Sequence, residues 1–401
     1  MNVSENLKML AAHMDMELNN ILNYWISNTI DLNNGGFYGQ IDGKGILHPG
    51  APKGSVLNTR ILWTFAAAYK YKKDSRYLDM AKRAKEYIFN YFIDKKYGGI
   101  FWTLDYKGKV LEPKKQIYAI AFAIYAFSEY YKISGDRNVL TKAIELYNLI
   151  EKYSFDSNYD GYFEAFSREW NNIDDLRLSD KDANEKKTMN THLHILEAYT
   201  SLFKVWPDDR LKIKLEGLIH IFLYKILDKT SYSFNLFFDE KWNIKSDVYS
   251  FGHDIEGSWL LYEAAKTINN KSLINKVTEV SISIAENILK NAIDNDGGLF
   301  NEIKNKRVVD TDKHWWPQAE AIVGFLNAFE ISANEKFAEA AFNVWNFINK
   351  YIIDKTKGEW FFRVNKEGMV YKNEDKVGLW KCPYHNSRCC IEAVERIGRL
   401  I

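Results

Sequence analysis

Histidines stand beside acids, amides and indoles at several places in a chain that holds only 8 histidines in 401 residues. The stretch YSFGHDIEGSWL, residues 249–260, places His253 three positions before Glu256. A histidine near a carboxylate can act as a general acid or base, because the carboxylate orients the imidazole and shifts its pKa. A helix cap or a solvated His–Glu pair would use the same residues, so this stretch alone leaves the function open.

Comparable residues recur wherever a predominantly apolar helix is predicted to begin. Imidazoles, amides, guanidinium groups and indoles together suit a polar, hydroxylated ligand that stacks on aromatic rings. The free N–H groups at helix starts add positive potential, which favours negative charge that develops during a reaction. The residues at these starts are Asn58, Arg60, Gln116, Tyr118, Asn190, His192, His194, His253, Glu256, His314, Trp315, Trp316, Gln318, Glu320, Trp380, His385 and Arg388.

Helical spacing separates candidate ligand-binding residues from core residues. His192 and His194 are two positions apart, so they lie on different faces of a helix and at most one faces the pocket. We expect His194 to face it, because Asn190 lies one turn earlier on the same face, and His192 to lie in the core. In HWWPQAE we expect one of the two indoles, Trp315 or Trp316, to face the ligand.

Other candidates have structural alternatives. Arg60 lies inside the apolar segment LNTRILWTFAAA, where it can bind a substrate or form a structural ion pair with Glu256 or Glu320. His385, in WKCPYHNSRCC, directly precedes the last predicted helix, so a helix cap is the alternative to a catalytic function.

The elements that position these residues follow a repeat. A Gly-aromatic segment recurs roughly every 62 residues, which indicates a repetitive architecture. Glycine followed by alternating aromatic residues predicts a short hairpin strand after a turn. The copies are GGFYGQ (35–40), GGIFWTLD (98–105), DGYFEAF (160–166), a weaker YSFNLFFDEKW (232–242), GGLFNEI (297–303) and GEWFFRV (358–364).

Between these segments, a largely apolar helical pattern is followed each time by an amphipathic one, as in 116–133 and 138–153. The first predicted helix, about 5–28, and the last have no partner unless they pair with each other. Their pairing closes the repeat into an all-α (α/α)6 barrel of six helical hairpins, with short β-hairpins at one end. An open solenoid would leave its terminal repeats exposed. We expect one domain, 1–401, and a charged surface loop at 167–187 that covers a site.

Composition excludes several classes of function. The net charge is +1 and no basic run is interleaved with aromatic residues, which argues against nucleic-acid binding. No segment approaches the ~18 apolar residues of a membrane span, and the N-terminus lacks a signal-peptide pattern. Three cysteines, two of them adjacent, fit a reducing cytoplasm. HExxH and paired CxxC motifs are absent, so a metal is possible but not needed, and phosphate-loop motifs are absent as well. We expect a monomer.

Four segments in order, MNTHLHILEAYT, FGHDIEGSWLL, KHWWPQAEAIVGF and GLWKCPYHNSR, resemble the N-acylglucosamine 2-epimerase superfamily over essentially the whole chain. The resemblance implies an (α/α)6 barrel and cofactor-independent inversion of C2 in the reducing-end glucose of a β-1,4-linked disaccharide. It implies His253 and His385 as an acid/base pair. From one helical turn away, we expect Glu256 to orient His253 and to tune its pKa. His194 and Arg60 would stabilise a cis-enediolate, and substrate contacts would come from Tyr118, Asn190, Glu256, Trp316, Glu320 and Trp380.

Related and unrelated activities compete with this interpretation. An aldose–ketose isomerase acting on mannose, or an epimerase acting on N-acetylglucosamine, would use much the same histidines. A glycoside hydrolase on the same barrel would need two carboxylates flanking the bond, and Asp254, Glu256 and Glu320 are the acids available. A non-catalytic carbohydrate-binding protein would not require two histidines in the pocket.

Overall fold

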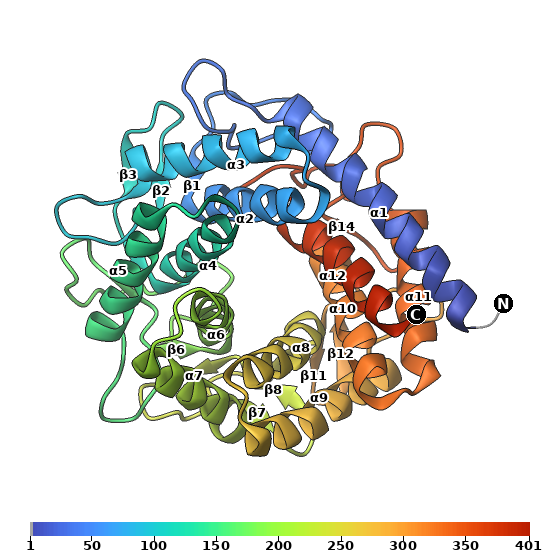
Figure 1. Cartoon of the computed structure of the whole chain (residues 1–401). Helices are drawn as coiled ribbons and strands as arrows, with labels where there is room; N and C mark the ends of the chain where they lie inside the picture. The colour runs from blue at the N-terminus through green and yellow to red at the C-terminus, as the bar shows by residue number, and fades with distance from the viewer. Residues whose placement is uncertain (1–2) are drawn as a thin grey trace.

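The protein is described here by a computed structural model that covers residues 3–401. Twelve α-helices make up most of this part of the chain (Figure 1). They are α1 (Val3–Asn28), α2 (Ser55–Lys72), α3 (Ser75–Tyr87), α4 (Ile117–Ser134), α5 (Arg137–Tyr153), α6 (Met189–Phe203), α7 (Asp209–Ile221), α8 (Phe251–Ile268), α9 (Lys271–Asn291), α10 (Trp315–Ser332), α11 (Glu335–Phe347) and α12 (Tyr384–Leu400). Three outer helices end in a π-helical turn: η1 (Ile88–Phe92), η2 (Phe222–Ile226) and η3 (Ile348–Ile352).

The even-numbered helices form an inner ring and the odd-numbered helices surround it (Figure 1). Each inner helix packs against the next, and α12 contacts α2, so the ring closes. Helix α1 packs along α12, which brings the first and last helices together as predicted. The architecture is therefore the predicted (α/α)6 barrel. No helix in residues 3–401 is both long enough and apolar enough to cross a membrane.

Burial explains the two kinds of helical pattern. In α4, every residue from Ile117 to Ile124 is buried, because this helix is enclosed by neighbours on all sides. The outer helix α5 buries a single stripe that includes Leu140, Ala143 and Ile150. A helix that is apolar around its circumference must be surrounded, whereas an amphipathic helix covers a core from one side.

The described part of the chain has fourteen short strands, which gather where the inner helices begin. Several pairs, such as β1 with β2 and β13 with β14, join successive repeats, so the strands form small inter-repeat sheets in addition to the predicted hairpins. The strands are β1 (Lys53–Gly54), β2 (Thr103–Leu104), β3 (Val110–Glu112), β4 (Lys115–Gln116), β5 (Ala165–Phe166), β6 (Lys187–Thr188), β7 (Leu227–Asp228), β8 (Ser233–Phe234), β9 (Phe237–Phe238), β10 (Val248–Ser250), β11 (Glu302–Lys304), β12 (Arg307–Asp310), β13 (Lys313–His314) and β14 (Arg363–Val364).

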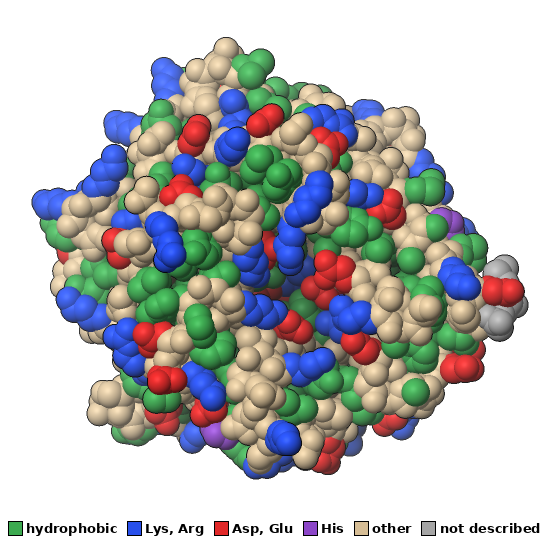
Figure 2. Space-filling view, in the orientation of Figure 1, with side chains coloured by type: hydrophobic (Ala, Val, Ile, Leu, Met, Phe, Trp, Pro, Cys, Tyr) green, Lys and Arg blue, Asp and Glu red, His purple; other side chains and the backbone are tan. Residues whose placement is uncertain are grey.

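The opposite end of the barrel, where the inner helices finish, has a different character. A hollow of about 460 Å³ opens there, and Figure 2 shows basic and acidic side chains around the centre of this face. Basic side chains lie in the last turns of four inner helices and directly after the last residue of a fifth, where they complement the negative ends of the helix dipoles. These residues are Lys70, Lys132, Lys204, Lys266 and Arg399.

Buried Lys–Asp ion pairs fasten the turns to the starts of the inner helices. Lys187 shows the pattern: it is fully buried two residues before α6, and its Nζ donates to Asp156 Oδ2 at 2.8 Å. The equivalent pairs are Lys53–Asp31, Lys115–Asp94, Lys313–Asp294 and Lys376–Asp354. In the fourth repeat Tyr249 replaces the lysine, and its hydroxyl donates to Asp228 at 3.1 Å. Sequence analysis did not identify these pairs, because a lone lysine usually indicates surface.

Removing one buried lysine tests whether these pairs support the barrel. Lys187→Met leaves the Asp156 carboxylate without its cation, and we expect the free energy of unfolding to fall by about 3–5 kcal/mol. Lys336→Met is the matched control, since Lys336 pairs with Glu286 on the surface, and it should cost at most about 1 kcal/mol. Urea denaturation measures both. Equal losses in the two variants would contradict the assignment.

Candidate active site

A cavity of about 470 Å³ lies among the N-terminal turns of the inner helices. Nine of the ten residues predicted for the site line it: Arg60, Tyr118, Asn190, His194, His253, Glu256, Trp316, Trp380 and His385. The tenth, Glu320, is fully buried behind the cavity wall and contacts His385. The ring therefore brings together residues from all parts of the chain, as the repeat predicted.

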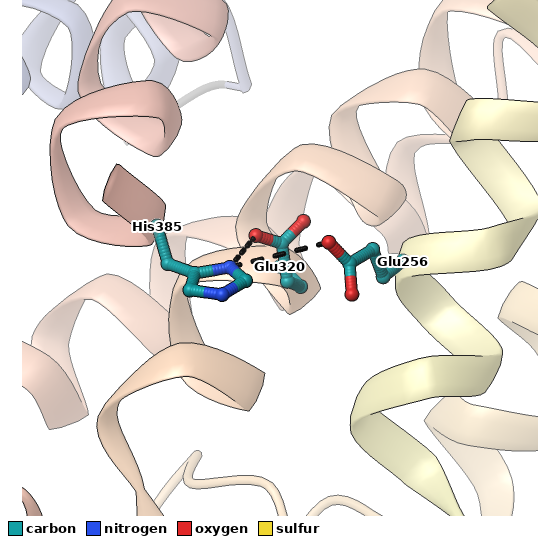
Figure 3. Close-up of side chains that lie close together, drawn as sticks. All are labelled: Glu256, Glu320 and His385. Carbon is teal, nitrogen blue, oxygen red and sulfur yellow. Dashed lines mark hydrogen bonds and ion pairs between the residues drawn. The ribbon is translucent and has the colours of Figure 1, made fainter. Parts of the chain in front are cut away.

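Helix α12 carries His385 in its first turn, after Pro383 at the helix boundary, so His385 is not the cap. The His385 Nδ1 atom lies 2.7 Å from Glu320 Oε1 (Figure 3). A carboxylate partner assigns the proton to Nδ1, which leaves Nε2 with a free lone pair. Burial lowers the pKa of His385 to about 3, although Glu320 acts in the opposite direction. His385 is therefore a neutral imidazole at neutral pH, with one nitrogen able to accept a proton.

As predicted, one of the two histidines of α6 faces the cavity and the other lies in the core. His194 lines the cavity, and its Nδ1 lies 3.0 Å from Glu197 Oε2. His192 is fully buried outside it: the Tyr162 backbone N–H donates to Nε2 at 2.9 Å, and Nδ1 lies 2.6 Å from the Thr188 carbonyl oxygen. Burial lowers the pKa of both imidazoles. His192 holds the turn that precedes α6, while His194 is available to a ligand.

His253 is placed differently from the prediction. Its ring lies 4.7 Å from the Trp316 ring between centroids, and His385 lies 5.6 Å from the same indole on this measure. No described residue hydrogen-bonds the His253 side chain, and burial lowers its pKa to about 3. The predicted orientation of His253 by Glu256 is wrong. Glu256 instead accepts from Arg388, because a guanidinium ion attracts a carboxylate more strongly than a neutral imidazole does.

Arg388 is the centre of a buried charge network. Its Nη2 donates to Glu256 Oε1 at 2.6 Å and to Glu320 Oε1 at 2.7 Å, while Nη1 donates to Glu197 and to the Tyr384 hydroxyl. Glu197 and Glu320 also contact two of the cavity histidines, His194 and His385. One guanidinium group thus connects these two histidines. Arg388 appeared among the helix-start residues in the sequence, but nothing there indicated that it would bind three acids.

The network shifts the pKa values of Glu320 and Glu256 in opposite directions. Burial pushes the pKa of Glu320 upward, but Arg388 and His385 outweigh burial and hold that pKa below its usual range. Burial and the adjacent Glu320 charge raise the pKa of Glu256. Glu320 is therefore the acid that stays ionised beside His385.

The charge of Arg60 is available to a ligand. Its Nη2 donates to the Tyr118 hydroxyl at 2.8 Å, and Nη1 lies 3.9 Å from Cys382 Sγ. No carboxylate of the described residues lies within ion-pair distance of Arg60, so the alternative of a structural ion pair with Glu256 or Glu320 does not hold. The Phe122 ring packs 4.2 Å from the guanidinium carbon and orients it.

Among residues 3–401, one group of histidine and acidic side chains has the spacing of metal ligands: Glu256, Glu320 and His385 (Figure 3). The Arg388 guanidinium donates to both of these carboxylates and supplies the positive charge between them. The two carboxylates that could bind a metal ion are thus already bound to the Arg388 guanidinium group.

The charged loop at 167–187 lines the cavity, as expected, through Leu178, Ser179, Asp180, Lys181 and Asp182. Gln116 holds the middle of the loop, because its Nε2 donates to the Arg177 carbonyl at 2.7 Å. Sequence analysis identified the loop by length and charge but selected none of its residues. No spacing signal marks which loop side chains face inward.

The fold and the cavity define an α/α-barrel protein with a cavity rich in histidine and tryptophan side chains. Residues 36–389 match the model of the N-acylglucosamine 2-epimerase family, and the chain belongs to this family. It is 47% identical over 388 residues to a cellobiose 2-epimerase from Bacteroides fragilis, covering 96% of this chain and 98% of the relative.

Solved structures agree with the fold. A cellobiose 2-epimerase from Bacillus thermoamylovorans superposes with a TM-score of 0.93 at 39% identity, covering 97% of this chain and 100% of the other. A D-mannose isomerase superposes with a TM-score of 0.83 at 21% identity, covering 96% and 97%, and at this identity it shows the fold alone.

Replacing Arg388 tests the charge network. Arg388→Met leaves buried carboxylates without their cation, and we expect a loss of about 3–5 kcal/mol in the free energy of unfolding. The double variant Arg388→Met/Glu256→Gln should lose less than Arg388→Met alone, because one uncompensated acid is removed as well. Chemical denaturation measures both. A double variant less stable than Arg388→Met would contradict the network.

Proposed function

We propose that this protein inverts C2 of the reducing-end glucose in β-1,4-linked disaccharides such as cellobiose, giving the mannose epimer. The observation that carries the proposal is the pair of imidazoles, His253 and His385, against one indole in the cavity that also holds Arg60. The relatives named cellobiose 2-epimerase, at 47% and 40% identity over nearly the full chain, support the same reaction.

The chemistry requires a base and a site for negative charge. Once the sugar ring opens, the aldehyde acidifies the C2 hydrogen, and its removal gives a cis-enediolate. A neutral imidazole can accept this proton, whereas an imidazolium ion cannot. Arg60 and His194 would hold the enediolate oxygens, since Arg60 has no carboxylate partner that would neutralise it.

His385 is the candidate for removing the C2 proton. Its Nε2 is the nitrogen left free by the Glu320 contact, and the Glu320 carboxylate would stabilise the imidazolium ion formed in this step. His253 would return a proton to the opposite face, or the intermediate would rotate about C2–C3 and recover a proton on the same side. Because burial keeps both imidazoles neutral in the free protein, His253 must first receive a proton from His385 or from water.

Aromatic and amide side chains would position the sugars. Trp316 and Trp380 are partly exposed in the cavity and offer ring faces for stacking. The Asn190 side-chain oxygen is buried without a partner among the described residues, and the Tyr118 hydroxyl is held by Arg60. One sugar hydroxyl would donate a hydrogen bond to the Asn190 oxygen. Another would exchange a hydrogen bond with the Tyr118 hydroxyl.

Substitution of the two histidines tests the assignment. We expect His385→Ala and His253→Ala each to lower kcat at least about 100-fold, because each removes an acid/base group. His220→Ala is the matched control: His220 lies exposed on α7 and should retain full activity. Chromatography after incubation with cellobiose and, separately, with mannose measures turnover. Fructose from mannose without any glucosyl-mannose from cellobiose would instead indicate an aldose–ketose isomerase, and free glucose a hydrolase.

Proton exchange tests the intermediate. In deuterium oxide, the epimer formed should carry deuterium at C2, because the abstracted proton exchanges on the base before its return. Nuclear magnetic resonance of the isolated disaccharides measures this. Complete conversion with no deuterium in either epimer would contradict an enediolate formed by exchangeable histidines.

The pH profile tests the charge state of His385. Because burial lowers its pKa to about 3, the imidazole remains able to accept a proton well below the ordinary histidine value of about 6.5. We expect kcat/KM to fall as the pH decreases through the lowered pKa, and most activity to persist at about pH 5. Initial rates across about pH 2.5–8 measure this, with circular dichroism to identify the pH range in which the protein stays folded. Half-loss near pH 6.5 in a folded protein would contradict it.

A further inference from the structure

Two of the protein's histidines are at least partly buried yet have no hydrogen-bond partner within residues 3–401. His13, His48, His192, His194 and His385 each contact a polar group through a ring nitrogen, and His220 is exposed. His253 and His314 have no such partner among the described residues. A partly buried imidazole without a partner loses its hydrogen bonds to water, so a structural function does not account for it.

His314 and His253 are also the histidines that line both parts of a larger cleft. A second cavity of about 670 Å³ adjoins the first beneath the loop at 167–187, and the two share His253, His314, Trp316 and Asn190 in their walls. We call the first cavity the inner part of this cleft and the second cavity the outer part. Arg60 and His385 line the inner part only. Asp310 lines the outer part only. His314 therefore lies on the wall that the two cavities share.

The surroundings of His314 are separate from the catalytic network. The charged groups that act on it are Arg363, Asp310 and Lys181, whereas Glu320 acts on His253. Arg363 is itself bound by Asp312 at 2.9 Å and by Glu374 at 2.6 Å, so its charge is matched. No carboxylate of the described residues lies within ion-pair distance of His314, and Asp310 raises its pKa less than burial and Arg363 lower it, so this residue is a poor candidate for removing a carbon-bound proton.

A neutral imidazole at this position suits a sugar hydroxyl. Burial and then Arg363 lower the pKa of His314 to about 4, so the ring carries one donor and one acceptor at neutral pH. The backbone of His314 pairs with Arg363 across β13 and β14, and the ring packs at 5.8 Å between centroids against Phe362. Strand pairing and packing against Phe362 thus hold the His314 side chain in place, without a hydrogen bond to its ring.

We propose that His314 hydrogen-bonds a hydroxyl of the second, non-reacting sugar ring and so determines specificity for disaccharides. This inference rests on the proposed function, which places the reacting ring in the inner cavity with Arg60 and His385. The glycosidic bond then directs the other ring toward the outer cavity, past His314.

Kinetics on cellobiose test this directly. An interaction with the non-reacting ring contributes equally to the substrate and transition-state complexes, so its loss raises KM and leaves kcat unchanged. We expect His314→Ala to raise KM about 3- to 10-fold, as one neutral hydrogen bond allows, with kcat within about 2-fold. His314→Asn, which keeps a donor and an acceptor, should recover part of the loss, and His220→Ala should change neither constant. If His314→Ala left KM unchanged, or slowed turnover about 100-fold as loss of an acid/base group would, the proposal would be overturned.

Binding without turnover separates this inference from the proposed function. The alditol made by reducing cellobiose has no aldehyde and cannot react, yet it keeps the second ring. Calorimetry should show weaker binding of this alditol to His314→Ala than to the unchanged protein, by the same factor of about 3 to 10. Glucitol, which lacks the second ring, should bind both proteins equally. If the unchanged protein fails to epimerise cellobiose, the proposed function fails, and the alditol titration still decides on His314. Equal binding of the cellobiose alditol to both proteins would overturn the inference.

Discussion

A single buried guanidinium ion, that of Arg388, holds the chemistry of this site in place. Removing an ion from water is costly, so Arg388 can be buried only because Glu197, Glu256 and Glu320 surround it. The dependence is mutual, since three acids on neighbouring inner helices could not be brought together without the cation. The network therefore ties α6, α8 and α10 to α12 at the depth where the cavity ends.

This arrangement also shapes the cavity histidines. Glu320 and Glu197 are positioned by Arg388, and each contacts the Nδ1 atom of one imidazole, which fixes its tautomer and directs Nε2 away from the acid. Enclosure by the barrel keeps His385 neutral despite its acidic partner, because burial holds its pKa low. His385 thus has a free lone pair on Nε2 and, at Nδ1, the Glu320 carboxylate, which would stabilise the protonated ring. His253 lacks such a partner and differs from His385 in this respect.

The barrel achieves this with a repeated device at each helix start. Buried lysines such as Lys115 and Lys313 bind the aspartates of the turns. These ion pairs fix the position along the barrel axis at which the following inner helix begins. Helix starts at one height place their first-turn side chains around a common cavity. The fourth repeat, which contains His253, uses Tyr249 in place of lysine and still meets the same aspartate position. A regular scaffold thus supports a site made of chemically different residues.

The sequence by itself determined the helix pairs, the closure of the ring and which residues share one end of it. These follow from hydrophobic periodicity and repeat spacing, which are local properties of the chain. It also separated His194 from His192, because helix geometry alone places them on different faces. Tertiary structure decided the partners: Glu256 binds Arg388, 132 positions away, and not His253 one turn away. Neutral imidazoles and buried lysines were likewise beyond prediction, since charge state and ion pairing depend on burial and on neighbours that only the folded barrel brings together.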